Sequence, residues 1–458
     1  MQLMGFRRLA PVALALFALA AVAGRAGASN DTAFNQQWNL QKISAPSAWN
    51  VSTGTGVTVG IVDSGADSGH PDFGGRVTTF RCTDTGGNVG NCGGPGTGED
   101  QNGHGTHVAG IVGATKDNNE GIAGVAPETR VVVAKVFTCN NAACDAPEAS
   151  FNDVAAGVNK VLQQGARVVN LSLGDPGVFA SGFLCNNSDF SELLNSIWNA
   201  NAVPVFAAGN CGGGFLGGGA NFQNTNALVV GATGPDDSVA GYSSSLSGAK
   251  WGLVAPGGAD ASCSSNSAGC ILSTWPRSKI TAGQAPYAWL RGTSMAAPHV
   301  AGAMAAILAR QPDRAAAVNA LLGGLDKISC GAGCQGRLNL ARALGAAPTA
   351  TPTTKPMPAP SGTTATTRRP SAPRSTAPSP ATSTSVTAEA TTTTSLSEQP
   401  AIADDDEIAQ SAVGQGSEDS RPKDDGVNGP LAVVGVLGVL GVGGTAAPLV
   451  WRRFLRPG

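Results

Sequence analysis

The strongest constraint on the fold is a series of Val-rich apolar runs that alternate with helix-like stretches. Short apolar runs of this kind are typical of strands that are buried on both faces. Alternation of strands with helices predicts βαβ units, and therefore an α/β fold with a mainly parallel sheet covered on both sides. The runs are residues 57–62, 131–137, 168–173, 203–207 and 228–230.

Two of the intervening stretches have apolar side chains at helical spacing. The first covers residues 151–162 and has one apolar face, formed by Val154, Val158, Val161 and Leu162. The next has the same pattern at Leu193, Leu194, Ile197 and Trp198. We interpret both stripes as core-facing surfaces of helices that cover the sheet.

The amino-terminal end differs in composition from the folded part. Residues 1–28 contain Arg7 and Arg8, an apolar run over residues 9–23 and a small-residue ending at 26–28, which together predict a secretory signal peptide. The arginine pair is also found in twin-arginine export signals, which the cysteine content disfavours. The formal net charge of −2 points to no particular partner, and we expect no nucleic-acid binding.

The carboxyl-terminal end changes character after residue 345. Residues 346–429 are rich in Thr, Pro and Ser and become acidic, which predicts a disordered stalk. Residues 430–451 lack charge and are long enough for a transmembrane helix across a hydrocarbon core of about 30 Å, with a buried core helix as the alternative. The basic tail, residues 452–458, would then lie in the cytoplasm. Residues 29–345 remain as the folded domain.

Ten cysteines in an exported chain predict disulfides. Zinc binding is the alternative, because some of the pairs have the close spacing of metal ligands. Pairing of near neighbours would close short surface loops and leave one longer bridge. The expected pairs are Cys82 with Cys92, Cys139 with Cys144, Cys263 with Cys270, Cys330 with Cys334, and Cys185 with Cys211.

Three polar residues have the types needed for nucleophilic catalysis. Ser294 lies where a strand or loop enters an Ala-rich helix, where a serine more commonly acts only as a helix cap. Asp63 follows the first Val-rich run directly, and His104 begins the segment His-Gly-Thr-His-Val-Ala-Gly. A serine hydroxyl attacks well only when a histidine takes its proton and a carboxylate orients that histidine. The order Asp, His, Ser along the chain is that of subtilisin.

Four motifs extend this agreement. They are residues 61–65 (Ile-Val-Asp-Ser-Gly), 104–110 (His-Gly-Thr-His-Val-Ala-Gly), 207–210 (Ala-Ala-Gly-Asn) and 292–298 (Gly-Thr-Ser-Met-Ala-Ala-Pro). In sequence and spacing, residues 29–345 resemble the subtilisin-like serine proteases (subtilases, peptidase family S8), which implies a three-layer fold and a serine endopeptidase acting on proteins or peptides. No cofactor is then needed for catalysis.

The resemblance also implies residue roles. Asp63 would orient His104, His104 would act as general base and then acid, and Ser294 would form the acyl-enzyme. Asn210, which is otherwise a polar turn residue, would donate to the oxyanion. Ser172, Leu173 and Gly174 would pair with the substrate backbone. Asp175, which follows them, would favour a basic substrate side chain or would be an exposed turn residue.

The other histidines have structural explanations. The chain has four histidines in total. His107 lies within the helix that begins at His104, and the resemblance implies a structural role for it. His299 lies in the helix after the serine and is expected to face the fold, and His70 belongs to a His-Pro-Asp turn.

A structural calcium site is implied by resemblance to thermitase-like members of the family. Calcium takes six to eight oxygen ligands, usually carboxylates mixed with backbone carbonyls. Asp31, Asp72 and Asn118 would supply side-chain oxygens, and Thr115, Glu120 and Ile122 would supply carbonyls. Solvated acidic loops are the alternative.

Two features depart from most secreted subtilases. The segment between residue 28 and the first strand is too short for an inhibitory propeptide. We therefore expect either that the domain folds unaided, helped by calcium and disulfides, or that latency is achieved in another way. The stalk and span resemble those of mycosins, the membrane-anchored subtilases of type VII secretion, and leave open a mainly structural or processing role in a secretion apparatus. We expect a single-pass protein of a bacterial cell membrane whose catalytic domain is extracytoplasmic.

Overall fold

The computed structural model describes residues 29–139, 141, 144, 147–173, 190–212, 222–259, 263 and 269–346. The predicted signal peptide, transmembrane helix and tail lie outside these residues, as does the predicted stalk apart from its first residue. Within the described part of the chain, no helix is long and apolar enough to cross a membrane.

The described residues form a central eight-stranded sheet with the strand order β12-β9-β8-β7-β6-β1-β3-β2, in which neighbouring strands are parallel. The predicted mainly parallel α/β fold is therefore confirmed. The strands are β1 (Thr58–Asp63), β2 (Val77–Arg81), β3 (Arg130–Lys135), β6 (Val168–Leu171), β7 (Val203–Ala207), β8 (Leu228–Thr233), β9 (Trp251–Pro256) and β12 (Cys334–Arg337).

Each of the five Val-rich runs overlaps a strand of this sheet, with ends displaced by up to three residues. Strands β2, β9 and β12 were not predicted. β2 and β12 are the edges of the sheet and carry polar or half-exposed side chains, so they lack a continuous apolar run. β9 is buried at five of its six positions but contains Gly252 and ends at Pro256, two residue types that are uncommon within strands.

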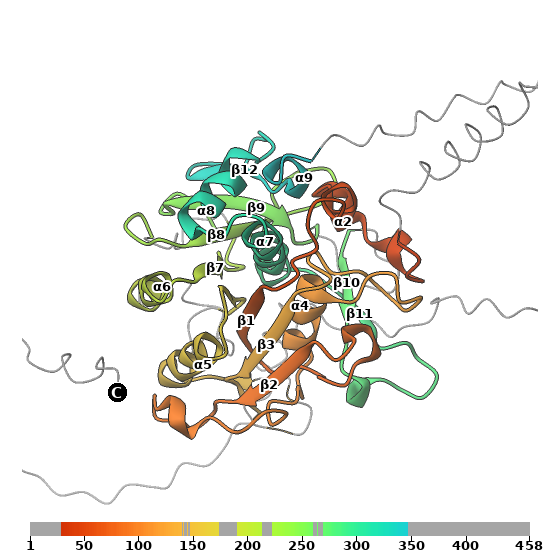
Figure 1. Cartoon of the computed structure of the whole chain (residues 1–458), viewed down its shortest axis with the longest axis vertical. Coiled ribbons are helices and arrows are strands. Elements are labelled where there is room, and N and C mark those ends of the chain that lie inside the picture. Colours follow the sequence, from red (N-terminus) through yellow and green to blue (C-terminus); the bar gives the residue numbers. More distant parts are fainter. Residues whose placement is uncertain are drawn as a thin grey trace, which may run out of the picture. The chain divides into compact units, whose positions relative to one another are not determined.

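Helices cover both faces of the sheet (Figure 1). One face packs against α4 (His104–Gly113) and α7 (Thr293–Leu308), and the other packs against α5 (Phe151–Gln163) and α6 (Phe190–Asn199). Within β1, Val59 and Ile61 point to the first layer and Val62 to the second, as the alternation of side chains along a strand requires. The predicted three-layer arrangement is thus present.

Smaller elements complete the domain. Helices α2 (Trp38–Lys42), α3 (Ala45–Ala48), α8 (Arg314–Gly323) and α9 (Leu340–Ala343) contribute side chains to the core on the α7 side. Two antiparallel pairs lie outside the main sheet: β10 (Ile271–Thr274) with β11 (Tyr287–Leu290), and β4 (Thr138–Cys139) with β5 (Pro147–Glu148). Short 3₁₀ helices occur at Phe34–Gln36, Pro71–Phe73, Val89–Asn91 and Arg277–Lys279.

The apolar stripes of α5 and α6 are buried, with two exceptions. Leu162 is only half-buried at the edge of the core. Trp198 does not join Leu193, Leu194 and Ile197; it packs against the core on the other side of the sheet and contacts Trp251, with ring centroids 5.2 Å apart. Trp198 lies one helical turn after Leu194, near the end of α6, where it is only half-buried and its ring meets that of Trp251.

Four predicted disulfides are confirmed: Cys82–Cys92, Cys139–Cys144, Cys263–Cys270 and Cys330–Cys334. Cys211 is also disulfide-bonded, and Cys185, its expected partner, lies outside the described residues. The bonded sulfurs exclude the zinc alternative for the four confirmed pairs.

Candidate active site

Three of the predicted site residues lie at the carboxyl ends of neighbouring strands. Asp63 is the last residue of β1, Ser172 directly follows β6, and Asn210 follows β7 by three residues. The strands β7, β6 and β1 are adjacent in the sheet. Open α/β sheets bind their ligands at this edge, so the fold itself brings these side chains together.

Asp63 and His104 form a direct pair. His104 Nδ1 lies 2.8 Å from Asp63 Oδ1, and the Asp63 carboxylate is completely buried whereas 14% of the His104 side chain is exposed. The backbone N–H of Ser64 donates to the same Asp63 oxygen at 2.7 Å. Because an ionised carboxylate only accepts, Nδ1 carries the proton in this pair and Nε2 of His104 is the basic nitrogen.

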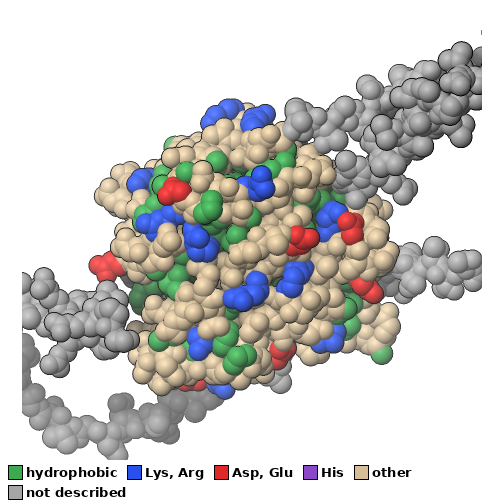
Figure 2. Space-filling model, viewed as in Figure 1, with side chains coloured by type: hydrophobic (Ala, Val, Ile, Leu, Met, Phe, Trp, Pro, Cys, Tyr) green, Lys and Arg blue, Asp and Glu red, His purple; other side chains and the backbone are tan. Residues whose placement is uncertain are grey.

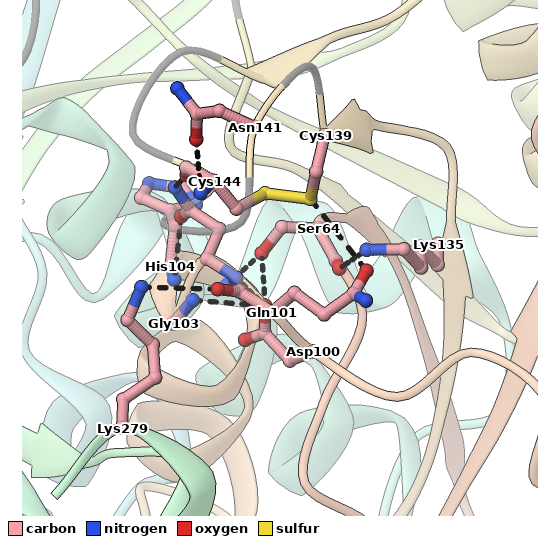
Figure 3. Close-up of a disulfide and its surroundings, with 12 residues drawn as sticks. Ser64, Asp100, Gln101, Gly103, His104, Lys135, Cys139, Asn141, Cys144 and Lys279 are labelled. Carbon is pink, nitrogen blue, oxygen red and sulfur yellow. Dashed lines mark hydrogen bonds between the residues drawn. A yellow bond between two sulfur atoms is a disulfide. The ribbon is translucent and has the colours of Figure 1, made fainter.

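The first turn of α4, which begins at His104, is held by three side chains. The N–H groups of His104, Gly105 and Thr106 donate to Asn102 Oδ1, Ser64 Oγ and Asp100 Oδ2 at 3.0, 2.9 and 2.9 Å. Figure 3 shows Ser64 and Asp100 beside His104. Helix N-termini leave such groups without intrahelical partners, so these contacts fix the position of the His104 backbone.

Gly103 has to be a glycine. It precedes His104 with a φ of +114°, a conformation that other residues rarely adopt. A Cβ atom at this position would also collide with the indole ring of the buried Trp275. The ring of Trp275 therefore packs directly under the backbone that carries His104.

Ser294 lies in the first turn of α7, which follows β11 through Arg291 and Gly292. Its carbonyl oxygen accepts a hydrogen bond from Ser172 Oγ at 2.8 Å. In a regular helix that carbonyl would accept from the N–H of residue 298, but Pro298 has none. Among the described residues, none accepts a hydrogen bond from the Ser294 N–H, so this donor is free at the helix start.

Asn210 is fixed through its oxygen. Its Oδ1 accepts from the backbone N–H and the hydroxyl of Thr293 at 2.9 and 3.0 Å. Thr293 Oγ1 in turn accepts from the N–H of Gly209 at 3.1 Å. The Asn210 amide nitrogen finds no acceptor within the described part of the chain, so it is a free donor near the Ser294 turn.

The segment expected to pair with substrate is described only in part. Ser172 and Leu173 are buried, and Gly174 and Asp175 lie outside the described residues. The Ser172 hydroxyl bonds to Ser294 O and to Asn170 Nδ2, the latter at 2.9 Å. The Ser172 side chain therefore supports the Ser294 turn, and the Ser172 carbonyl accepts a long hydrogen bond from Ser294 Oγ at 3.4 Å.

The remaining histidines are internal. His107 and His299 are fully buried, and burial lowers their pKa values to about 3 and about 4. His70 accepts from the N–H of Asp72, and burial lowers its pKa as well. These placements agree with the structural roles expected for all three.

The proposed calcium ligands lie in one network. Asp31 Oδ1 accepts from the N–H of Asn118 at 3.1 Å, and Asp72 Oδ1 accepts from Asn118 Nδ2 at 2.9 Å. The N–H of Ile122 donates to Asp72, that of Glu120 to Asn118, and that of Thr115 to the Asp72 carbonyl. Across the residues that the structure describes, no three Asp, Glu, His or Cys side chains are grouped to hold a metal.

Several supporting residues were not predicted: Ser64, Asp100, Asn102, Lys135 and Thr293. Lys135 Nζ donates to the Ser64 carbonyl at 2.9 Å, and burial lowers the pKa of this lysine. Asp100 and Asn102 precede the helix at His104, and Asp and Asn at such positions are a capping pattern that the sequence does show. Lys135 had no comparable pattern, since it ends an apolar strand.

Comparison with known proteins agrees with this geometry. A sequence model of the subtilase family matches residues 54–322. Thermitase of Thermoactinomyces vulgaris is 35% identical over 323 residues, which are 69% of this chain and 98% of thermitase. Subtilisin Savinase of Lederbergia lenta is 35% identical over 276 residues, 60% of this chain and 85% of that protein.

A solved structure of a protease from Pseudoalteromonas arctica PAMC 21717 has the same fold. Its TM-score is 0.55 at 27% sequence identity, with 69% of this chain and 99% of the other covered. The chain belongs to the subtilase family. It is a serine endopeptidase, which acts on proteins or peptides.

Proposed function

We propose that this endopeptidase cleaves peptide bonds through a triad of Asp63, His104 and Ser294. The observation that carries the proposal is the 2.8 Å contact between His104 Nδ1 and the buried Asp63 carboxylate. This contact leaves Nε2 to take the Ser294 proton as Oγ attacks the substrate carbonyl. Asp63 stabilises the imidazolium that results, and His104 then gives the proton to the leaving amine.

Two free donors would stabilise the tetrahedral intermediate. They are the amide nitrogen of Asn210 and the N–H of Ser294, both at the amino end of α7. The positive end of the helix dipole lies at the same place. Developing negative charge on the substrate oxygen would therefore meet fixed donors that need no rearrangement.

A fluorophosphonate probe tests the triad directly, because it reacts with a serine only when that serine is activated. We expect the folded, calcium-loaded protein to acquire one adduct on Ser294, detected by mass spectrometry of the intact protein and its peptides. Ser294→Ala serves as the control and should acquire none. Absence of an adduct on the folded wild-type protein would contradict the proposal.

We infer that the enzyme acts outside the cytoplasm and is anchored to a cell membrane. The disulfides support an oxidising compartment. The charge-free stretch 430–451 and its basic flank support the anchor. Deletion of residues 430–458 should move the protease from the membrane fraction to the soluble extracytoplasmic fraction with its peptidase activity intact. Retention in the membrane fraction would refute the anchor.

The predicted stalk and span favour a second candidate, a mycosin-type subunit of a secretion apparatus. In that case the protein would be needed as a component, with turnover secondary. Secretion in cells that carry only the Ser294→Ala variant separates the two candidates. Normal secretion with an inactive serine supports the structural role, and its loss supports proteolysis.

We propose a structural calcium ion at Asp31, Asp72 and Asn118, with carbonyls of Thr115, Glu120 and Ile122. Asp31 and Asp72 are buried, and desolvation is the main cause that raises both pKa values, that of Asp72 to about 6. Two desolvated carboxylates in one network suit a cation that neutralises them. Rotation of the Asn118 side-chain amide by half a turn would direct its oxygen, in place of its nitrogen, towards the calcium ion.

Chelation tests the calcium proposal without reference to activity. We expect EDTA to lower the melting temperature of Ser294→Ala protein and added calcium to restore it, as binding to the folded state requires. Added magnesium should restore much less, since it demands a smaller octahedral site. An unchanged melting temperature after chelation would end the proposal.

A further inference from the structure

The Cys139–Cys144 disulfide lies beside the segment that leads into His104 (Figure 3). Cys139 ends β4, which follows β3 by two residues, and β3 ends at Lys135 opposite Asp63. Cys139 Sγ is 3.6 Å from Gln101 Oε1, and Lys279 Nζ donates to the Gln101 carbonyl at 3.1 Å. The bridge is thus packed next to the segment 100–103.

Asn102 connects the bridge to His104. Its Nδ2 donates to the Cys144 carbonyl at 2.7 Å, and its Oδ1 accepts from the His104 N–H at 3.0 Å. Its own N–H donates to Asp100 Oδ1 at 3.0 Å. The two ends of the amide have opposite partners, so the side chain has one satisfied orientation. A displacement of the Cys144 carbonyl would therefore be transmitted to the backbone of His104.

The position of the Cys144 carbonyl depends on the bridge. Cys144 is 1% exposed and has a positive φ of +54°, which costs a residue with a side chain about 1 kcal/mol or more. Its N–H donates to Asn141 Oδ1 at 2.7 Å, which holds one side of the residue. The disulfide to Cys139 holds the other side and ties the residue to β4.

We propose that the Cys139–Cys144 disulfide positions His104 through Asn102, and that Asn102 is a positioning residue for proton transfer. This inference rests on the proposed role of His104 as the general base. The bridge fixes the Cys144 carbonyl, the carbonyl orients the Asn102 amide, and the amide fixes the first turn of α4. Small errors in the placement of a base are costly to turnover, because the proton has to pass across a hydrogen bond of well-defined geometry.

Two disulfides of nearly equal size allow a matched experiment. Cys139–Cys144 and Cys330–Cys334 have sequence separations of 5 and 4, so chain entropy predicts similar losses of stability when each is removed. The variants are C139S/C144S and C330S/C334S, assayed in calcium well below their melting temperatures. We expect kcat/KM to fall about fivefold in C139S/C144S, which corresponds to the loss of about 1 kcal/mol from one weakened hydrogen bond. In C330S/C334S we expect kcat/KM to stay within about twofold of wild type.

Asn102→Ala removes both contacts of the link and should lower kcat/KM about tenfold. If bridge and amide act in series, the triple variant C139S/C144S/N102A should be no slower than Asn102→Ala alone. If the loss of kcat/KM in the triple variant equals the product of the losses in C139S/C144S and in Asn102→Ala, the two effects are independent and the proposed link is overturned.

A small probe separates positioning from contact with substrate. The loop could affect a peptide simply by touching it, and then only peptide cleavage would change. A small fluorophosphonate needs only Ser294 and His104, so its labelling rate should fall by the same factor as kcat/KM. An unchanged labelling rate in C139S/C144S would overturn the proposal. Failure of the wild-type protein to label at all would instead refute the triad itself.

Discussion

Helices α4 and α7 both begin at the site, and their first turns differ in whether every N–H group has a partner. The first N–H groups of α4 all bond to side chains of the protein, from Ser64, Asp100 and Asn102. At the start of α7 the Thr293 N–H bonds to Asn210 Oδ1 and the Ser294 carbonyl accepts from Ser172 Oγ, but the Ser294 N–H stays free in the described structure. A base requires a fixed orientation, whereas the helix of a nucleophile has to offer donors to the substrate.

The largest effect is expected when the fixed pair at α4 is broken. Asp63→Asn should lower kcat about 10⁴-fold with little loss of stability, because an amide that donates to Nδ1 leaves the proton on Nε2 of His104. Steady-state kinetics on a peptide substrate measure the loss. Asp153→Asn, a change at the start of α5 on the other face of the sheet, is the control and should retain kcat. A loss under tenfold in Asp63→Asn would show that orientation by Asp63 is not required.

The next largest effect is expected from removal of the free Asn210 amide donor near the start of α7. Asn210→Leu should lower kcat about 10²- to 10³-fold with KM nearly unchanged, the magnitude measured for this kind of donor in subtilisin. Asn195→Leu, a change in α6, is the matched control. A change confined to KM would mean that Asn210 binds the ground state and does not serve the oxyanion.

A third prediction concerns what holds α7 to the fold. His299 accepts from Asn39 Nδ2 and donates from Nδ1 to the Met295 carbonyl, each at 2.8 Å, so it is needed in its neutral form. Burial lowers its pKa from 6.5 to about 4. The unfolded chain therefore binds a proton that the folded chain excludes, and stability falls as pH drops from 6.5 towards 4, by about 3 kcal/mol.

Urea unfolding of the inactive Ser294→Ala protein at several pH values measures how the free energy of unfolding changes with pH. His107 adds a similar contribution, because burial lowers its pKa to about 3. The control is therefore the difference between Ser294→Ala and Ser294→Ala/His299→Gln, in which the His299 share should disappear. Equal slopes in the two proteins would assign the acid sensitivity to other groups.

The smallest effect is expected from loss of the hydrogen bond between Ser172 Oγ and the Ser294 carbonyl, which takes the place of the helical bond that Pro298 cannot donate. Ser172→Ala should lower kcat about tenfold, since one buried hydrogen bond to the Ser294 turn is lost. Ser172→Thr keeps the hydroxyl and should recover most of the rate. Ser196→Ala removes a similar bond to a carbonyl within α6 and should have no effect on kcat. A fully active Ser172→Ala enzyme would show that α7 needs no such support.

Comparison of particular residues shows why sequence reasoning stopped where it did. Asp63, His104, Asn210 and Ser294 could be predicted as site residues because strand ends, helix starts and chain order are local or sequential properties. Ser172 was expected at the site for its backbone, but the bond of its side chain to the Ser294 carbonyl joins positions 122 residues apart. Trp198 was assigned to the wrong core layer because its contact with Trp251 likewise joins distant positions of the chain.

The sequence by itself determined the parallel α/β fold and four of the disulfide pairs, and it predicted candidate residues of the site, because periodicity, motif spacing and near-neighbour cysteines are written along the chain. Only the tertiary structure decided how the two helix starts differ, and that the Cys139–Cys144 bridge reaches His104 through Asn102. Hydrogen bonds and core contacts between distant segments depend on distances of a few ångströms, and no local pattern encodes such distances.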